Sequence, residues 1–115
     1  MKTVTLRIEK LDQALDRFAD AWKTGSGADR DVIAFEDWEV MHRVLSPNRM
    51  AILRALGGAG TISIRELARR AGRDFKGVHS DVRALLDAGI LRRNEAGVEF
   101  PFDRIRLDVE IPAAA

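Results

Sequence analysis

The sequence contains no cysteine, which excludes disulfides, thiolate nucleophiles and thiolate metal sites. A cytoplasmic location is the default expectation for such a chain. No run of about 18 apolar residues occurs either, so we expect no transmembrane helix and no membrane partner. The N-terminal residues MKTVTLRIEK alternate between polar and apolar types and lack the apolar stretch of a signal peptide.

Patterns of catalytic and metal-binding residues are also missing. The sequence has two histidines, His42 and His79, and two histidines without cysteine make a poor metal site. His42 lies near an apolar helix face, where we expect a core or interface position. The GGAG stretch that starts at Gly57 follows a predicted helix and not a strand, so we interpret it as a helix terminator. We expect no enzyme activity, no cofactor and no metal.

The chain does contain enough apolar surface for one compact domain of 115 residues, with 46% hydrophobic and 32% charged residues. Its net charge of +1 conceals an uneven distribution. Residues 46–93 carry ten basic and four acidic side chains, whereas residues 1–45 carry seven and nine, and residues 94–115 carry two and five. A basic segment between acidic flanks indicates an anionic partner, although arginines are also common on solvated helix faces.

The middle of the chain predicts three helices in succession. Ser46, followed by proline, starts a helix that ends near residue 56. Ser63 starts a second helix, and Gly72 ends it. Asp74 caps a third helix over residues 75–87. The inward stripe of this third helix comprises Phe75, Val78, Val82, Leu85 and Leu86.

The outer face of the third helix carries the main functional prediction. Opposite the apolar stripe lie four hydrogen-bond donors at i, i+3, i+4 and i+7, namely Lys76, His79, Ser80 and Arg83. Such side chains can reach phosphates and the acceptor atoms of base edges in a major groove. Arg73 precedes the helix, and Gly77 allows a close approach of the backbone. We expect Asp81 and Asp87 to lie outside the donor row.

Further arginines flank this helix. Three belong to the preceding helix, where they can touch phosphates: Arg65, Arg69 and Arg70. Arg92 and Arg93 begin a hairpin whose turn is predicted at residues 94–97. The tip offers Asn94 and Glu95 and no basic residue, so a wing that contacts the duplex and a hairpin that only closes the core both remain open interpretations.

The stretch LSPNRMAILRALGGAGTISIRELARRAGRDFKGVHSDVRALLDAGILRR resembles prokaryotic winged helix-turn-helix transcriptional regulators, broadly of the ArsR and MarR types. More closely, it is similar to a group of small predicted regulators with the pattern RELARR-G-D-KGVH-DV-AL, often thought to be encoded beside a toxin-like partner. The resemblance spans residues 35–102 and implies that Lys76, His79, Ser80 and Arg83 lie on a recognition helix. The metal-sensing cysteines of the ArsR type are absent, so metal sensing of that kind is not implied.

The terminal segments predict a homodimer. Residues 2–8 and 104–111 alternate as half-buried strands do, and residues 11–22 have a helical period that Gly25, Ser26 and Gly27 interrupt. Two lone strands would be marginal, so we expect these segments to bind a second copy and to hold two recognition helices about 34–36 Å apart. The expected interface comprises Val4, Leu6, Ile8, Leu15, Phe18, Trp22, Ile105, Leu107 and Val109.

These patterns predict an α+β, mainly α, fold. A winged helix-turn-helix occupies residues 46–102, a strand–helix dimerisation extension residues 1–45, and a C-terminal strand and tail residues 103–115. The function predicted first is a sequence-specific regulator of transcription, a dimeric repressor that reads a palindrome in double-stranded DNA through residues 74–88. The alternative is an antitoxin or adaptor that binds a toxin-like protein through its acidic terminal segments, with or without autoregulation.

Overall fold

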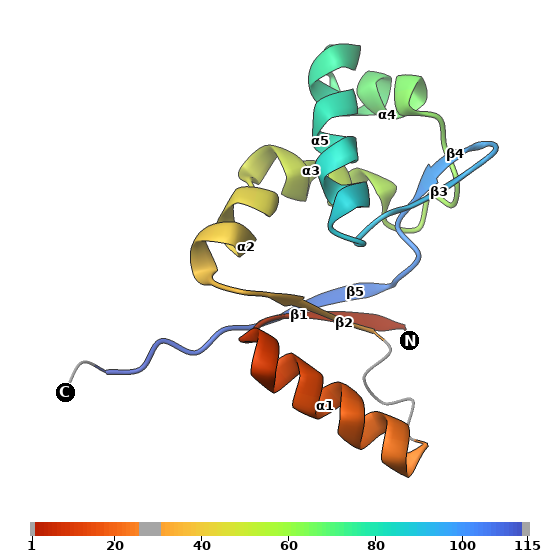
Figure 1. Ribbon diagram of the computed structural model, residues 1–115. Coiled ribbons are helices and arrows are strands. Elements are labelled where there is room, and N and C mark those ends of the chain that lie inside the picture. Colours follow the sequence, from red (N-terminus) through yellow and green to blue (C-terminus); the bar gives the residue numbers. More distant parts are fainter. Residues whose placement is uncertain (1, 26–30, 114–115) are drawn as a thin grey trace.

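The structure of the protein, a computed structural model that describes residues 2–25 and 31–113, is an α+β fold (Figure 1). The elements within these residues are β1 (Thr3–Ile8), α1 (Leu11–Thr24), β2 (Val32–Phe35), α2 (Trp38–Val44), α3 (Pro47–Leu56), α4 (Ile64–Ala71), α5 (Phe75–Asp87), β3 (Arg92–Asn94), β4 (Gly97–Glu99) and β5 (Arg104–Asp108). Gly25 ends α1 in the left-handed region, as predicted, with φ at 67°. Ser26 and Gly27 of the predicted interruption lie outside the described residues, as do the last two residues of the C-terminal tail.

A three-stranded parallel sheet joins the two ends of the chain. Its strand order is β2-β1-β5, with β1 in the centre. Helix α1 makes the crossover from β1 to β2, because parallel neighbours cannot be joined by a tight turn. In the register, Leu6 lies between Ile33 of β2 and Leu107 of β5. The two terminal strands therefore complete a sheet within one chain, whereas the sequence predicted that they would need a second copy.

The two faces of this sheet have opposite character. Side chains alternate along each strand, so Val4 and Leu6 point to one face while Thr5 and Arg7 point to the other. Figure 1 shows the first face covered by α2 and the helices beyond it, and α1 lying across the second. Val4 and Leu6 are 0% exposed within the single chain. The hydrophobic effect thus buries the apolar face of the sheet against the chain's own helices.

That burial corrects part of the predicted dimer interface. Val4 and Leu6 are inaccessible to a second copy, and three further members of the set are half-buried against the same core: Ile8, Ile105 and Val109. The other four remain exposed, namely Leu15, Phe18, Trp22 and Leu107. The prediction was wrong for Val4 and Leu6 because they belong to one buried cluster with Phe35 and Met41. Both of these residues lie far along the chain, and alternation within a strand does not show which segment covers it.

Helices α3, α4 and α5 together with the hairpin β3–β4 form a second part, which we call the helix–hairpin unit. Its helix starts agree with the sequence. The Ser46 hydroxyl accepts a hydrogen bond from the Arg49 amide at 3.3 Å, and the Ser63 hydroxyl accepts one from the Glu66 amide at 3.1 Å. Gly72 ends α4 in the left-handed region, with φ at 65°.

The hairpin is attached to the segment before α4. Strands β3 and β4 are antiparallel, and a backbone bridge joins Ile62 to Val98. Gly97 makes this attachment possible, because its φ is 147° and a Cβ atom there would lie 2.1 Å from the Ile62 carbonyl oxygen. The strands are shorter than the predicted ones, and the turn is reduced to Glu95 and Ala96.

The longest described helix, α1, has 14 residues. Across residues 2–25 and 31–113, none of the helices combines the length and the apolar character that a membrane span needs.

Candidate nucleic-acid interface

Helix α5 is fixed at its start by a side chain and along its length by the core. The Asp74 carboxylate accepts a hydrogen bond from the Gly77 amide at 2.9 Å, which satisfies one free donor of the first turn. Val78, Val82 and Leu85 are fully buried at 0% exposure. These two constraints set the rotation of α5 about its axis and turn its opposite side outward.

The outward side of α5 carries most of the predicted donors. Lys76, Ser80 and Arg83 are exposed, while His79 is half-buried. Asp87 also belongs to this row, contrary to the sequence prediction, because the Arg83 Nε atom lies 3.6 Å from its carboxylate. Both side chains of that pair are largely solvent-exposed, so the pair is weak and Arg83 can exchange it for another anion at little cost.

Phe75 lies on the surface, although the sequence placed it in the buried stripe. Its side chain is 43% exposed at the first position of α5. The Arg65 guanidinium of α4 lies over the ring, 5.2 Å from its centre, and the His79 ring lies 5.7 Å away. The periodicity assigns Phe75 to the stripe of Val78 and Val82, but it does not show how far along the helix the core extends.

Arg73 has an internal role that the sequence missed. Its Nη1 atom donates to Asp81 at 2.8 Å, and Arg49 of α3 donates to the other oxygen of the same carboxylate at 3.1 Å. Asp81 therefore holds the start of α5 and α3 together. Gly77 faces this pair, since a Cβ atom there would lie 3.1 Å from Arg73 Nη2. The sequence predicted that Arg73 and Gly77 contact DNA, but both are half-buried, and Arg73 is already bound to Asp81.

Two arginines of α4 are held by one carboxylate. Arg69 Nε donates to Glu66 at 2.9 Å, a second bond joins Arg69 Nη2 to Glu66, and Arg70 Nε donates to Glu66 at 3.0 Å. The hydrogen bonds from Arg69 and then Arg70 lower the pKa of Glu66 from 4.5 to about 2. The same contact raises the pKa of Arg69. Part of the positive charge predicted for DNA is thus neutralised within α4.

The hairpin contributes little free positive charge. Arg92 lies 3.9 Å from the Glu99 carboxylate, whereas Arg93 is exposed and has no ionic partner among the described residues. At the tip, the Asn94 amide donates to the Thr61 hydroxyl at 2.9 Å, which ties the hairpin back to the segment before α4. The hairpin tip is thus fixed to the rest of the helix–hairpin unit, and Arg93 is its basic side chain without an ion pair among the described residues.

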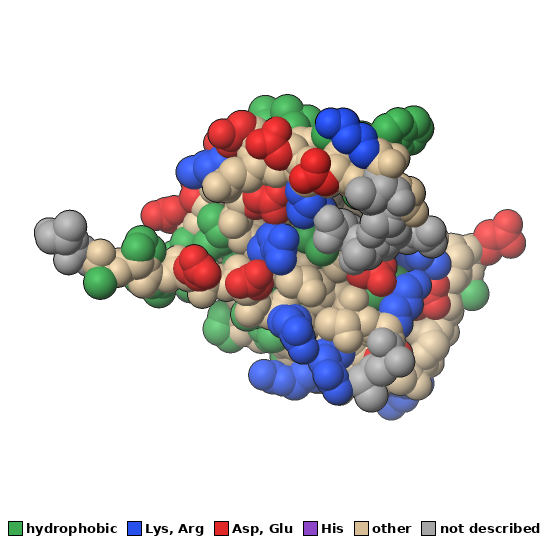
Figure 2. Space-filling model, turned by 90° about the horizontal axis from the view of Figure 1, so that it is seen from below, with side chains coloured by type: hydrophobic (Ala, Val, Ile, Leu, Met, Phe, Trp, Pro, Cys, Tyr) green, Lys and Arg blue, Asp and Glu red, His purple; other side chains and the backbone are tan. Residues whose placement is uncertain are grey.

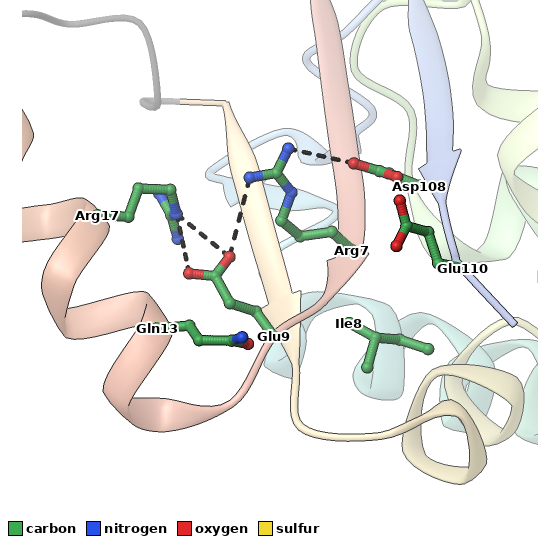
Figure 3. A pocket seen from close by; sticks show the side chains of 7 residues that line it. All are labelled: Arg7, Ile8, Glu9, Gln13, Arg17, Asp108 and Glu110. Atoms are coloured by element: carbon green, nitrogen blue, oxygen red, sulfur yellow. Dashed lines mark hydrogen bonds and ion pairs between the residues drawn. The ribbon is translucent and has the colours of Figure 1, made fainter. Parts of the chain in front are cut away.

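A separate polar cavity of about 430 Å³ lies at the carboxyl ends of β1 and β5 (Figure 3). Arg17 of α1 donates to both oxygens of Glu9 at 3.1 and 3.2 Å. Arg7 lies 3.9 Å from Glu9 and donates to Asp108 at 3.2 Å. Ligands often bind at such an edge of a parallel sheet, but here Arg7 and Arg17 are already paired with Glu9 and Asp108, and Glu110 leaves the lining with one negative charge in excess. The network instead ties α1 to the sheet.

The histidines lie apart on different helices. His42 is exposed on α2, which excludes the core position that the sequence allowed but not an interface position, and its ring lies 5.7 Å from that of Trp38. The buried residue of that helix is its neighbour Met41. Within the described part of the chain, no three histidine, aspartate or glutamate side chains converge as metal ligands would.

Comparison with known proteins shows the family to which the chain belongs. No curated protein and no solved structure matches the chain. A family model described as HVO_A0114 matches residues 44–107, which is more than half of the sequence. The match contains α3, α4, α5 and the β3–β4 hairpin and leaves β1 and α1 outside. The chain belongs to the HVO_A0114 family.

Proposed function

We propose that the protein is a transcriptional regulator that binds double-stranded DNA through a winged helix-turn-helix. The order α3, α4, α5 and hairpin supports this proposal, as does the three-residue turn from Gly72 to Asp74 between α4 and α5. In that motif the helix before the turn crosses the DNA backbone, and the helix after the turn enters the major groove. Here α5 is the recognition helix and β3–β4 is the wing.

The observation that carries the proposal is the outward row of α5. Lys76, Ser80 and Arg83 are exposed on the side opposite the buried Val78 and Val82. A helix of 13 residues is about 20 Å long and fits the major groove, which is about 12 Å wide. These donors reach phosphates and base-edge acceptors without any rearrangement of the core.

The side chains of this surface have different tasks. Arg83 binds a guanine edge once it leaves Asp87, and Lys76 binds a phosphate or a base near the start of α5. Phe75 offers an apolar contact to a thymine methyl group, with Arg65 held over its ring. Arg69 and Arg70 contribute less than the sequence predicted, because Glu66 competes for both.

Binding of duplexes from the chain's own upstream region, measured at several salt concentrations, tests the proposal. Lys76→Ala should weaken binding to all duplexes and lower the salt slope by about one. Arg83→Ala should cost about 1–3 kcal/mol on the preferred site and relax the preference at one base pair. Arg54→Ala is the control, since Arg54 is equally exposed but lies on α3. If all three variants bind like the wild type, α5 does not contact DNA.

The antitoxin or adaptor function stays a prediction. It requires a surface for a protein partner, and the exposed apolar side chains of α1 are the part of the molecule that such a partner would use. A second copy of this chain is the other candidate for that surface, and sedimentation of the chain alone distinguishes the two.

A further inference from the structure

Helix α1 exposes the large apolar side chains that an amphipathic helix normally buries. Leu11, Leu15, Phe18 and Trp22 follow i, i+4, i+7 and i+11 spacing, and they are 58–80% exposed. We call these four residues the α1 stripe. A contiguous apolar row of this kind is rare on a monomer surface and marks an interaction site.

The ion pairs at the sheet explain why α1 does not turn its stripe inward. The residues of α1 that are half-buried toward the sheet are Ala14, Arg17 and Ala21. Arg17 is fixed there by Glu9, which is itself buried at 9% exposure. With 3.6 residues per turn, the stripe lies about 100° around the helix from these residues. The stripe therefore points along the plane of the sheet. Figure 2 views the side of the molecule on which α1 lies, and it shows charged side chains across the middle and hydrophobic ones toward the edges.

We propose that the α1 stripe packs antiparallel against the α1 stripe of a second copy. The stripe is complementary to itself in this arrangement. With a two-fold axis midway between Leu15 and Phe18, Leu15 faces the partner's Phe18 and Leu11 faces the partner's Trp22. Each contact joins a leucine to an aromatic ring, which fits the close spacing of packed helices.

Charge favours the same antiparallel arrangement. Asp12 in the first turn and Lys23 in the last turn of α1 lie on the same flank of the stripe. The antiparallel pair brings Asp12 of each copy beside the partner's Lys23, which gives two symmetry-related ion pairs. It also places the two helix dipoles side by side in opposite directions, which is favourable. A parallel pair would align the dipoles and lose both ion pairs.

The surface is large enough for a specific dimer. An aromatic side chain carries about 150–250 Å², so the two stripes together offer on the order of 1,000 Å² of apolar area, which reaches the lower range of specific interfaces. Aromatic side chains at the centre of such a contact supply most of its binding energy. Phe18 lies next to the two-fold axis and is the residue on which the dimer depends most.

The sideways direction of the stripe also determines where the two helix–hairpin units of a dimer lie. This part of the inference rests on the proposed DNA-binding function. The two-fold axis of the antiparallel pair runs perpendicular to both helices and parallel to the sheet normal. In one chain the sheet and the helix–hairpin unit lie on the same side of α1 (Figure 1). The two-fold axis therefore places both sheets and both helix–hairpin units on the same side of the paired helices. That is the arrangement in which two recognition helices can meet one palindromic duplex.

Sedimentation of the full chain without DNA tests the dimer independently of DNA binding. The wild type should sediment at micromolar concentration as twice its 12.8 kDa mass. Phe18→Glu should raise the dissociation constant by about 30-fold or more, because a hot-spot residue is lost from both copies. Its circular dichroism, and its unfolding at concentrations where the wild type is also monomeric, should match the wild type, since Phe18 is 65% exposed in one chain. Leu107→Glu, at an exposed apolar residue of β5, is the matched control and should leave the dimer intact.

The absence of cysteine allows a clean test of orientation. A mixture of Asp12→Cys and Lys23→Cys chains should form a disulfide-linked dimer on oxidation, whereas Asp12→Cys alone should not. A monomeric wild type would overturn the proposal and return the stripe to a different protein. A dimer broken by Leu107→Glu but not by Phe18→Glu would overturn it in favour of a β5 interface. Cross-linking of Asp12→Cys alone, with no mixed dimer of Asp12→Cys and Lys23→Cys chains in the mixture, would overturn the antiparallel arrangement.

Discussion

Helices α1 and α5 are both amphipathic, yet the structure uses their faces in opposite ways. Helix α5 buries its apolar side and presents hydrogen-bond donors to solvent, whereas α1 rests small and charged residues on the sheet and exposes its large apolar ones. The periodicity of the two segments is alike, so it identifies a stripe but not what covers the stripe. What covers α5 is the chain's own core, and what we propose for α1 is a second copy.

The largest effect that separates the two helices concerns stability. Leu85→Ala removes a fully buried side chain of α5 and should lower the free energy of unfolding by about 2–5 kcal/mol. Leu15→Ala is the same change in α1, where the leucine is 58% exposed, and should cost less than about 1 kcal/mol at concentrations where the chain is monomeric. Urea unfolding at two protein concentrations measures both. Equal losses at low concentration would mean that α1 is packed within one chain.

A smaller effect distinguishes structural arginines from DNA-binding ones. Arg73→Ala should lower the free energy of unfolding by about 1–2 kcal/mol, because Asp81 keeps one of its two guanidinium partners and loses the other. The salt slope of DNA binding should not change, in contrast to Lys76→Ala. A lowered slope with unchanged stability would restore the sequence prediction that Arg73 contacts phosphate.

Phe18 and Phe75 are both exposed, and replacing each by alanine should affect a different interaction. Phe75→Ala should weaken binding to a preferred duplex by about 1 kcal/mol, the value of a lost methyl contact, and leave the dimer unchanged. Phe18→Ala should weaken the dimer while a single half-site duplex binds as before. Binding and sedimentation measured on both variants decide the matter, and identical behaviour of the two would remove the distinction between the faces.

The smallest effect is a dependence of stability on pH. The folded-state pKa of Glu66 lies near 2, below 4.5, so its contribution to stability is complete above about pH 4.5 and is lost as the pH falls toward 2. The stability difference between the wild type and Glu66→Gln should therefore shrink over that range. Asp87→Asn, which removes the weaker pair with Arg83, is the comparison and should show little such change. If the stability difference between the wild type and Glu66→Gln stays constant over this pH range, the pKa of Glu66 is not lowered by its arginine partners.

The features that could be predicted from the sequence are those that depend on residues close together along the chain. Helix starts at Ser46, Ser63 and Asp74 depend on residues three positions away, and all three caps were predicted. The buried Val78 and Val82 followed from the helical period. These features are local, so a single sequence contains the information.

The features that the sequence missed depend on distant partners. The pairing of β1 with β5 joins positions about a hundred residues apart, and the Asp81 carboxylate that holds Arg73 also accepts a hydrogen bond from Arg49, which belongs to α3. The donor row of α5 was predicted from spacing, whereas the neutralised Arg69 was not; its ion pair with Glu66 is local, at i and i+3, and helical spacing could have revealed it. The direction of the α1 stripe was likewise set by Glu9, outside the helix.

The central claim is that the outward face of α5 meets duplex DNA. Amide chemical-shift mapping of the ¹⁵N-labelled chain during titration with a duplex from its upstream region tests this claim most directly. We expect the largest shifts between residues 75 and 83 and at Arg93 of the hairpin, with α1 little affected at constant protein concentration. Shifts confined to α1 or to the sheet, with residues 75–83 unmoved at saturation, would contradict the claim.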